Sequence, residues 1–355
     1  MQLYPPMNRW LVPFLAAVTY AGCALPDDPE TEVGTVSQEI ACPSDFCGKN
    51  SPTIMNHSFW ELSLQHLTND QGFSFTTFQK NGLEYTLQVT NGVITGYRRG
   101  YPMLAGQALV GSEIGLKWTG GGTYALVITG VVSSPFWASA SPTAHPLIET
   151  YGMKWQELHG GIKGPLVDLC GNDKAYDALL GMNAHATLVF EGERFNADSK
   201  TIIGVDNSYF NFGCAGSALA KMQLTGHTQA AKAYGFTTSI AERQTMLKML
   251  TADYCGTGKA FTAPGEPLHW ADDKGWMQVN ATDTLEARWN EKGAICLGKP
   301  RLVANPNWMW KDPSGEPDVQ VAIDNECKLA NGATLPPCAD GSLTPSPQHL
   351  ISANY

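Results

Sequence analysis

The chain of 355 residues carries 33 acidic and 23 basic side chains, a formal net charge of −10, and 43% of its residues are hydrophobic. A chain of this length and apolar content can bury its own core, as one large domain or two modest ones. Scattered Lys and Arg in an acidic chain exclude the basic surface that binds a nucleic-acid backbone, so we expect no nucleic-acid partner. The 36 Gly and 22 Pro residues favour strands and turns over a helical bundle.

Residues 1–22 are typical of an export signal. Arg9 precedes an apolar stretch over residues 11–18, which is too short to span a bilayer. The string Tyr-Ala-Gly-Cys23 follows and resembles the lipobox of bacterial lipoproteins, in which the Cys becomes acylated. Tyr20 departs from that pattern, because a Leu is usual at this position.

An ordinary signal peptide cut after Ala21 is the alternative to the lipoprotein. Two observations favour acylation of Cys23: it leaves an even number of cysteines, and the acidic, Pro-rich residues up to Ile40 have the composition of a solvated tether. We therefore expect a flexible tether over 23–40. The lipid membrane would be a partner through acylated Cys23, placing the protein in the cell envelope, at the outer membrane.

The predicted N-terminal β region, residues 41–99, opens with Cys42 and Cys47, whose spacing suits a local disulfide. Zinc is the alternative, but it needs a second close pair of ligands and none is near. The alternating residues 83–89, a turn at Asn91-Gly92 and residues 93–97 predict a hairpin.

Further strands and two helices follow along the chain. Segments 114–118 and 124–132 predict a second hairpin, and Thr187–Phe190 a further strand. Two short helices are expected over about 214–225 and 239–254.

The second helix begins at a capping box formed by Ser239 and Glu242, and its apolar residues cluster on one side. Phe261–Asp272 then predicts another hairpin. The fold class expected is α+β, mainly antiparallel β with the two helices packed on one side and about four disulfides.

The string Thr251-Ala-Asp-Tyr-Cys-Gly256 resembles the name-giving motif of the ADYC-domain family of bacterial envelope proteins, for which no activity is assigned. A Gly-rich segment at 104–114, Cys170-Gly and Phe-Gly-Cys214 before the motif, and Gly-Ala-Ile-Cys296 after it, support the resemblance. It covers roughly residues 100–300, which we take as the family domain. Residues 301–355 are left as a loop-rich C-terminal extension.

Two departures from the family pattern involve methionine. Met222 and Met246 stand where the family has cysteines, so the resemblance implies that relatives carry a disulfide between these positions. We expect the two methionines to touch here and to pack the two helices together, because the flexible thioether fills irregular gaps.

The eight cysteines after Cys23 allow 105 connectivities. Spacing suggests the pairs Cys42–Cys47 and Cys327–Cys338. For the remaining four cysteines, our preferred pairs are Cys170–Cys214 and Cys255–Cys296.

Cys255 and His269 are candidates for a catalytic pair of nucleophile and base. Cys255 follows the C-terminal end of a helix, which does not lower a thiol pKa, so a disulfide is favoured instead.

Carboxylate pairs at Glu191/Glu193 and Asp272/Asp273 suit a glycosidase, but a solvated strand face is the favoured interpretation of Glu191 and Glu193. Trp308 and Trp310 are the one tryptophan pair in a polar context and are candidates for an exposed stacking surface.

We therefore assign no catalytic residue, metal site or cofactor, and the residues favour a non-catalytic binding or structural protein of the cell envelope. Its partners would be an envelope glycan or protein, beside the membrane. The alternative is a hydrolase that acts on envelope or extracellular polymers with catalytic residues dispersed along the chain.

Overall fold

The computed structural model describes residues within the unit Val33–Tyr355. These are residues 52–55, 57–138, 145–170, 186–196, 198–262, 268–304, 318–339, 342–345 and 350–354. Several sequence predictions lie outside them: the signal and tether with Cys23, the Cys42–Cys47 pair, and the tryptophans Trp308 and Trp310.

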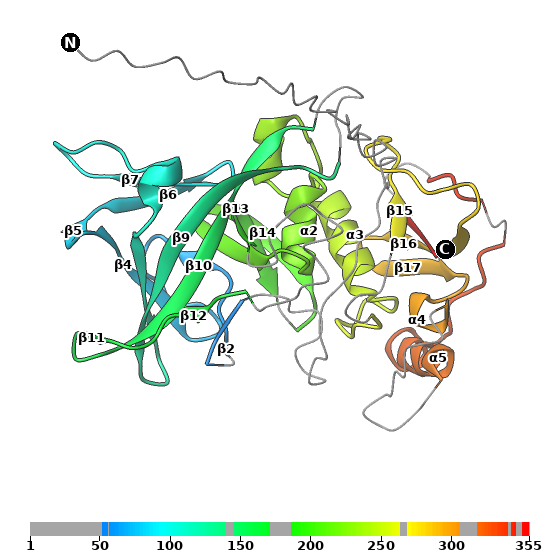
Figure 1. Cartoon of the computed structure of the whole chain (residues 1–355). Coiled ribbons are helices and arrows are strands. Elements are labelled where there is room, and N and C mark those ends of the chain that lie inside the picture. The colour runs from blue at the N-terminus through cyan, green and yellow to red at the C-terminus, as the bar shows by residue number, and fades with distance from the viewer. Residues whose placement is uncertain are drawn as a thin grey trace, which may run out of the picture. The chain divides into compact units, whose positions relative to one another are not determined.

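A large antiparallel sheet dominates the described residues (Figure 1). Its strands follow the order β3-β14-β13-β10-β9-β8-β4-β5, and β11 and β12 pair with β10, which makes ten strands in the described part of the chain. Their bounds are β3 (Leu62–Ser63), β4 (Phe73–Lys80), β5 (Leu83–Glu84), β8 (Glu113–Trp118), β9 (Thr123–Pro135), β10 (Leu147–His159), β11 (Ile162–Lys163), β12 (Val167–Asp168), β13 (Ala186–Asn196) and β14 (Thr201–Cys214).

A β-bulge in β4 decides which of its side chains reach the core. The register against β8 shifts between Phe75 and Thr77, so one extra residue stands on β4. Phe73, Phe75 and Phe78 are all buried although their spacing changes from two to three residues. The extra residue restores the alternation, because a bulge turns the following side chains to the opposite face.

Both hairpins predicted near the N-terminus are confirmed. Strands β6 (Thr86–Thr90) and β7 (Val93–Tyr97) pair around Asn91 and Gly92, which both have positive φ, as this tight turn requires. Strand β8 pairs with β9 as expected. A further short pair is formed by β1 (Thr53–Ile54) and β2 (His57–Ser58).

Strand β13 lies between two hydrophobic cores. Leu188 and Phe190 belong to one core cluster, whereas Val189 belongs to the other. This burial on both faces explains why the strand has a nearly continuous apolar run at its start. The predicted strand is confirmed and extends well beyond Phe190.

A second sheet has the order β15-β18-β16-β17. Its strands are β15 (His269–Ala271), β16 (Thr284–Asn290), β17 (Gly293–Leu297) and β18 (Leu350–Asn354). The hairpin predicted over Phe261–Asp272 is therefore wrong: β15 pairs with β18, from the far end of the chain. Every residue of β18 is buried between its neighbours, and the C-terminal segment that was expected to be loop-rich supplies this inner strand.

Two helices lie between the sheets, and both were predicted. Helix α2 packs against β13 and β14, and helix α3 packs against α2 and against β14 and β16 (Figure 1). The helices and 3₁₀ segments are η1 (Gly106–Leu109), α2 (Ala218–Leu224), η2 (Ala230–Tyr234), α3 (Ile240–Thr251), α4 (Arg301–Ala304) and α5 (Val319–Asn331). In the described part of the chain, no helix is long and apolar enough to cross a membrane.

The surroundings of α3 differ from the amphipathic helix that was expected. The capping box of Ser239 and Glu242 is confirmed. Every residue from Arg243 to Thr251 is buried, polar ones included, because the helix is covered by elements of both sheets. Met222 and Met246 are fully buried in the same core cluster, and their direct contact stays a prediction.

Three disulfides join cysteines in the described part of the chain, whose fold is mainly antiparallel β with a few helices. Cys170 is joined to Cys214, the pair that was preferred from the sequence. The predicted pairs Cys255–Cys296 and Cys327–Cys338 are wrong, because Cys255 is joined to Cys327 and Cys296 to Cys338. The unpredicted helix α5 carries Cys327 to Cys255, and this leaves Cys296 and Cys338 to pair.

Candidate functional site

The Ala252–Cys255 motif ends helix α3 in a tightly bonded turn. Ala252 adopts the left-handed conformation, with φ of 49°, and Asp253 follows it with a fully buried side chain. Oδ2 of Asp253 lies 2.5 Å from Nζ of Lys248 and accepts a hydrogen bond from the backbone N–H of Gly258 at 2.9 Å. Lys248 also donates to the carbonyl of Ser199 at 2.7 Å. The Asp side chain thus closes the turn on the helix that precedes it.

The tyrosine of the motif packs against the second sheet. Its ring stacks on Trp289, with ring centroids 5.1 Å apart, and its hydroxyl donates to Glu286. Arg301 pairs with the same carboxylate through two hydrogen bonds, Nε to Oε1 at 2.7 Å and Nη2 to Oε2 at 3.0 Å. Burial raises the pKa of Tyr254 well above its usual value, so the phenol stays a proton donor.

Cys255 and Gly256, at the end of the motif, both contact other segments of the chain. Cys255 is bridged to Cys327 of helix α5, so a disulfide at Cys255 is confirmed and the alternative of a nucleophile paired with His269 has no free thiol. A Cβ at Gly256, whose φ is +74°, would overlap the carbonyl oxygen of Lys292. The motif is therefore a structural junction of α3, α5 and the β16–β17 turn, and not a reactive centre.

The carboxylate pair Glu191 and Glu193 is buried, which corrects the expected solvated strand face. Glu191 is 6% exposed and Glu193 is fully buried. A register shift between Glu191 and Gly192 also breaks the regular alternation that would place both carboxylates on one face. Glu191 bonds the β6–β7 turn, whereas Glu193 pairs with Arg243 of helix α3. The two carboxylates therefore do not form a two-carboxylate site.

Glu193 pairs with helix α3 and with the loop before η2. It accepts a hydrogen bond from the backbone N–H of Gln229, and its Oε1 lies 3.1 Å from Nε of Arg243. Burial raises the pKa of Glu193 to about 7, and the nearby Arg243 opposes this rise. A carboxylate held this deeply, with 0% exposure, has no access to a polymer substrate.

The Asp272 and His269 side chains are also used inside the protein. Oδ1 of Asp272 accepts from the backbone N–H groups of Lys274 and Trp276, both at 2.9 Å, and burial raises its pKa to about 6. Nδ1 of His269 lies 2.7 Å from Oδ2 of Asp283, and both side chains are 3% exposed. Neither residue is among those that line the one described cleft.

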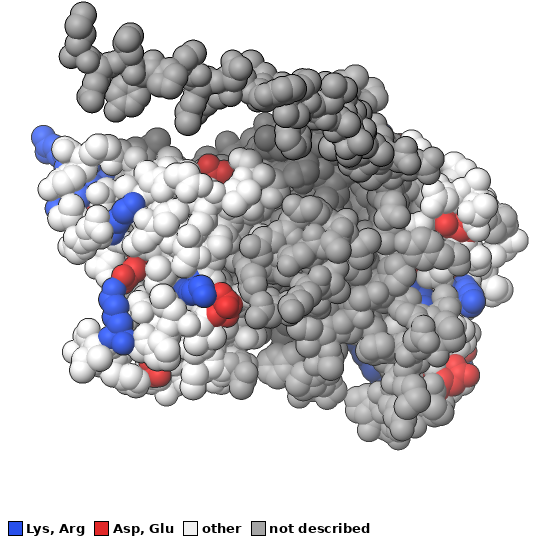
Figure 2. Space-filling model, viewed as in Figure 1, with Lys and Arg blue, Asp and Glu red and all other residues white. Residues whose placement is uncertain are grey.

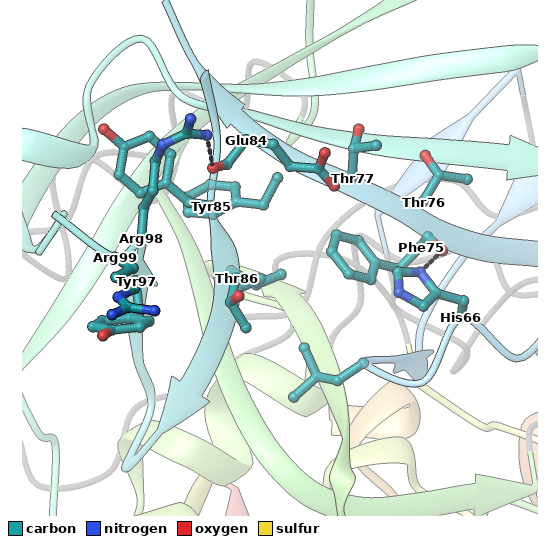
Figure 3. Close-up of a pocket in the computed structure, with 13 residues that line it drawn as sticks. His66, Phe75, Thr76, Thr77, Glu84, Tyr85, Thr86, Tyr97, Arg98 and Arg99 are labelled. Atoms are coloured by element: carbon teal, nitrogen blue, oxygen red, sulfur yellow. Dashed lines mark hydrogen bonds between the residues drawn. The ribbon is translucent and has the colours of Figure 1, made fainter. Parts of the chain in front are cut away.

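An open cleft of about 520 Å³ lies between strand β4 and the β6–β7 hairpin, and we call it the hairpin cleft (Figure 3). Its apolar floor includes Phe78 and Leu87, which are buried. Its volume falls within the range of small-ligand sites, about 300–1,000 Å³.

The two walls of the hairpin cleft differ in chemistry. Figure 3 shows Tyr85, Tyr97, Arg98 and Arg99 on the hairpin side and His66 across from them. Thr76 and Thr77, at the bulge of β4, line the cleft on the His66 side, and Thr86 lines it on the hairpin side. Glu84 is the one acidic residue among those that line the cleft.

The basic wall is ordered by contacts of its own. Nη1 of Arg98 donates to the carbonyl of Glu84 at 2.7 Å, and its guanidinium lies 4.8 Å from the centre of the Tyr101 ring. Tyr101 in turn meets Tyr85 edge to face, with ring centroids 6.5 Å apart. Blue side chains gather at the upper left of Figure 2, over the region that carries β5–β7 in Figure 1.

The hairpin that forms this wall is anchored at its turn. Glu191 accepts hydrogen bonds from the backbone N–H groups of Asn91, at 2.7 Å, and Gly92, at 3.1 Å. Tyr234 donates to the carbonyl of Asn91 at 2.9 Å, and Tyr151 accepts from the N–H of Ile94 at 2.8 Å. These contacts fix the turn end of the hairpin, whereas Arg98 and Arg99 follow β7 at the opposite end.

None of the cleft residues was predicted from the sequence as a functional residue. Their one local signal is the run Tyr97-Arg-Arg-Gly-Tyr101, in which two arginines stand between aromatic residues at the end of a strand. The opposite wall has no such signal, because His66 and the β4 threonines meet the hairpin only in the folded chain.

Comparisons with known proteins agree with the motif. No curated protein and no solved structure matches the chain. A family model, the ADYC domain, matches residues 106–303, more than half of the chain. The hairpin cleft is built from residues 64–99 and so precedes the matched segment. Within that segment lie the Ala252–Cys255 motif and the Cys170–Cys214 bridge. Cys327 and Cys338, the partners of Cys255 and Cys296, follow it. The chain belongs to the ADYC-domain family.

Proposed function

We propose that this protein is a non-catalytic binding protein that acts outside the cytoplasm and holds its ligand in the hairpin cleft. The observation that carries the proposal is the cleft of about 520 Å³ with an apolar floor and the guanidinium groups of Arg98 and Arg99 at its wall. Polar and charged side chains beside an apolar floor can select a ligand by its shape and charge.

Binding without turnover fits the distribution of the acidic groups. Glycoside hydrolysis needs two carboxyl groups that face each other across the substrate. Glu84 stands alone among the residues that line the cleft. Glu193 and Asp272, whose pKa values burial raises, are enclosed by backbone and side-chain partners elsewhere.

The cysteines support a location outside the cytoplasm. Three disulfides persist in an oxidising compartment, and reducing cytosolic conditions disfavour them. The lipobox-like string that ends at Cys23, with the acidic tether after it, supports attachment to an envelope membrane through an acylated cysteine. The tether would leave the globular body free to reach ligands near that membrane.

The binding proposal is tested with the full chain, solubilised in detergent, on immobilised polysaccharide and peptidoglycan fractions of the envelope. We expect retention that falls at least tenfold in an Arg99→Gln/Tyr97→Leu variant, and no release of new chain ends from the retained polymer. Retention that is equal in this variant contradicts the cleft as the site. Release of chain ends that stops in Glu84→Gln identifies a hydrolase instead.

The anchor is tested separately by labelling cells with a fatty-acid analogue. We expect label on the wild-type protein and none on Cys23→Ser, which would also leave the membrane fraction. A Cys42→Ser variant is the matched control and keeps the label. Equal labelling of wild type and Cys23→Ser would contradict the anchor without touching the cleft.

A further inference from the structure

The chemistry of the hairpin cleft points to one ligand class, an acidic glycan strand that carries carboxylate groups. This inference rests on the proposed binding function and names the ligand of the same site. Three observations support it: the two arginines, the exposed Tyr97 ring together with the threonines that line the cleft, and the paired edge of strand β4.

The arginines indicate an anionic ligand. A guanidinium presents five N–H donors in a planar fork that matches a carboxylate. Arg98 uses Nη1 on the carbonyl of Glu84, which fixes the group and leaves further donors to face a ligand. Arg99 is exposed beside it. Because the whole chain carries a charge of −10, a polyanion is repelled at a distance and must be held by close pairing with these two groups.

The rings and hydroxyl groups indicate a sugar. Tyr97, which lines the cleft and precedes the two arginines in the chain, is 55% exposed. Such rings present an apolar face and a polar tip, which suits a ring-shaped ligand with apolar faces and a hydroxylated rim. The threonines that line the cleft, Thr76, Thr77 and Thr86, carry hydroxyl groups, which both donate and accept hydrogen bonds, as sugar hydroxyls require.

The edge of β4 argues against an extended peptide. Strand addition needs free backbone groups along an open edge. Here the carbonyl of Phe73 accepts from the N–H of Asn69, that of Phe75 is bonded to the His66 ring, and that of Phe78 accepts from the N–H of Tyr85. With these acceptors used, a ligand is recognised through side chains, which favours the glycan.

The test is calorimetric titration of the full chain with three probes: oligogalacturonate, its neutral methyl ester, and poly-glutamate. The ester keeps the sugar and removes the charge, whereas poly-glutamate keeps the charge and removes the sugar. We expect oligogalacturonate to bind at least tenfold more tightly than either. Arg99→Gln should weaken it at least tenfold, because charge-assisted pairs are strong. Tyr97→Leu should weaken it threefold to tenfold.

Lys292→Gln, which removes an exposed charge on the β16–β17 turn, is the matched control and leaves the affinity unchanged. Equal binding of the ester or of poly-glutamate overturns the acidic-glycan inference and leaves the cleft as a binding site. So does failure to bind oligogalacturonate while envelope fractions are still retained through Arg99 and Tyr97. Retention on envelope fractions that is unchanged when Arg99 and Tyr97 are substituted overturns the proposed binding function itself.

Discussion

Nζ of Lys248 lies 2.5 Å from Oδ2 of Asp253, and neither side chain is more than 1% exposed. The two residues lie at the end of helix α3, five positions apart, so the pair closes the turn that leads into the second sheet. Both charges are out of water, and each therefore depends on the other for compensation. Asp253 of the family motif therefore stabilises the fold through this buried ion pair.

Removing one partner of the pair should cost more than a typical substitution. We expect Asp253→Asn to lower the free energy of unfolding by about 3–5 kcal/mol, because the buried ammonium of Lys248 loses its counter-charge. Urea unfolding followed by circular dichroism measures the loss. Glu326→Gln, which breaks the half-exposed pair with Lys259, should cost below about 1 kcal/mol. A loss of that size in Asp253→Asn would contradict the structural role.

The disulfide assignment is open to direct mapping. Proteolysis without reduction should release one peptide pair that joins Cys255 to Cys327 and another that joins Cys296 to Cys338. A Cys255→Ser/Cys327→Ser variant should lose about 2–4 kcal/mol of stability, since the bridge closes a long loop. A linked peptide with Cys255 and Cys296 would contradict this connectivity.

Asp272 should make the fold less stable as the pH rises. Its pKa is about 6 in the folded state against a usual 3.8, so folding is favoured below about pH 4 and this contribution is lost as the pH rises through 6. We expect Asp272→Asn, which keeps the Oδ1 acceptor, to stabilise the protein at pH 7 by up to about 3 kcal/mol and to have little effect at pH 4.

Thermal unfolding over a pH series measures the effect of this substitution. Glu291→Gln, at an exposed position, is the control and should leave the pH profile unchanged. An Asp272→Asn profile parallel to that of the wild type would show that the carboxyl titrates normally.

Glu191 should control the order of the hairpin. Its carboxylate accepts the N–H groups of both turn residues, and charge-assisted bonds of this kind contribute about 1.5–3 kcal/mol each. We expect Glu191→Gln to speed amide hydrogen exchange at Asn91 and Gly92. Glu84→Gln, an exposed change on the neighbouring strand, should leave both amides protected. Unchanged exchange in Glu191→Gln would show that other contacts hold the turn.

Local signals predicted the elements that depend on neighbouring residues. The Asn91-Gly92 hairpin and the Ser239 capping box involve residues a few positions apart, and both are confirmed. Helix α5 and strand β18 were not predicted, because the C-terminal segment that contains them is rich in Pro and Asn. Strand β18 also depends on pairing with β15 and β16, which no local pattern indicates. The disulfide errors followed, since Cys327 sits on the missed helix.

The candidate site escaped prediction for the same reason. Arg98 and Arg99 form a visible pair in the sequence, but the wall opposite them comes from a β4 bulge that no local pattern marks. The expected solvated face at Glu191 was wrong because the β6–β7 turn and α2 cover that part of the sheet. Alternation of polar and apolar residues indicates which side chains of one strand share a face. It does not indicate whether a distant hairpin covers that face.

The sequence by itself determined the family, the antiparallel β-rich class, the two central helices and the oxidising setting of the cysteines. Those features depend on short-range patterns and on composition, which survive without knowledge of partners. Only the tertiary structure decided which cysteines meet, that the motif is buried, and where a ligand can bind. Each of these depends on contacts between residues far apart in the chain, which form because distant segments bury apolar surface together.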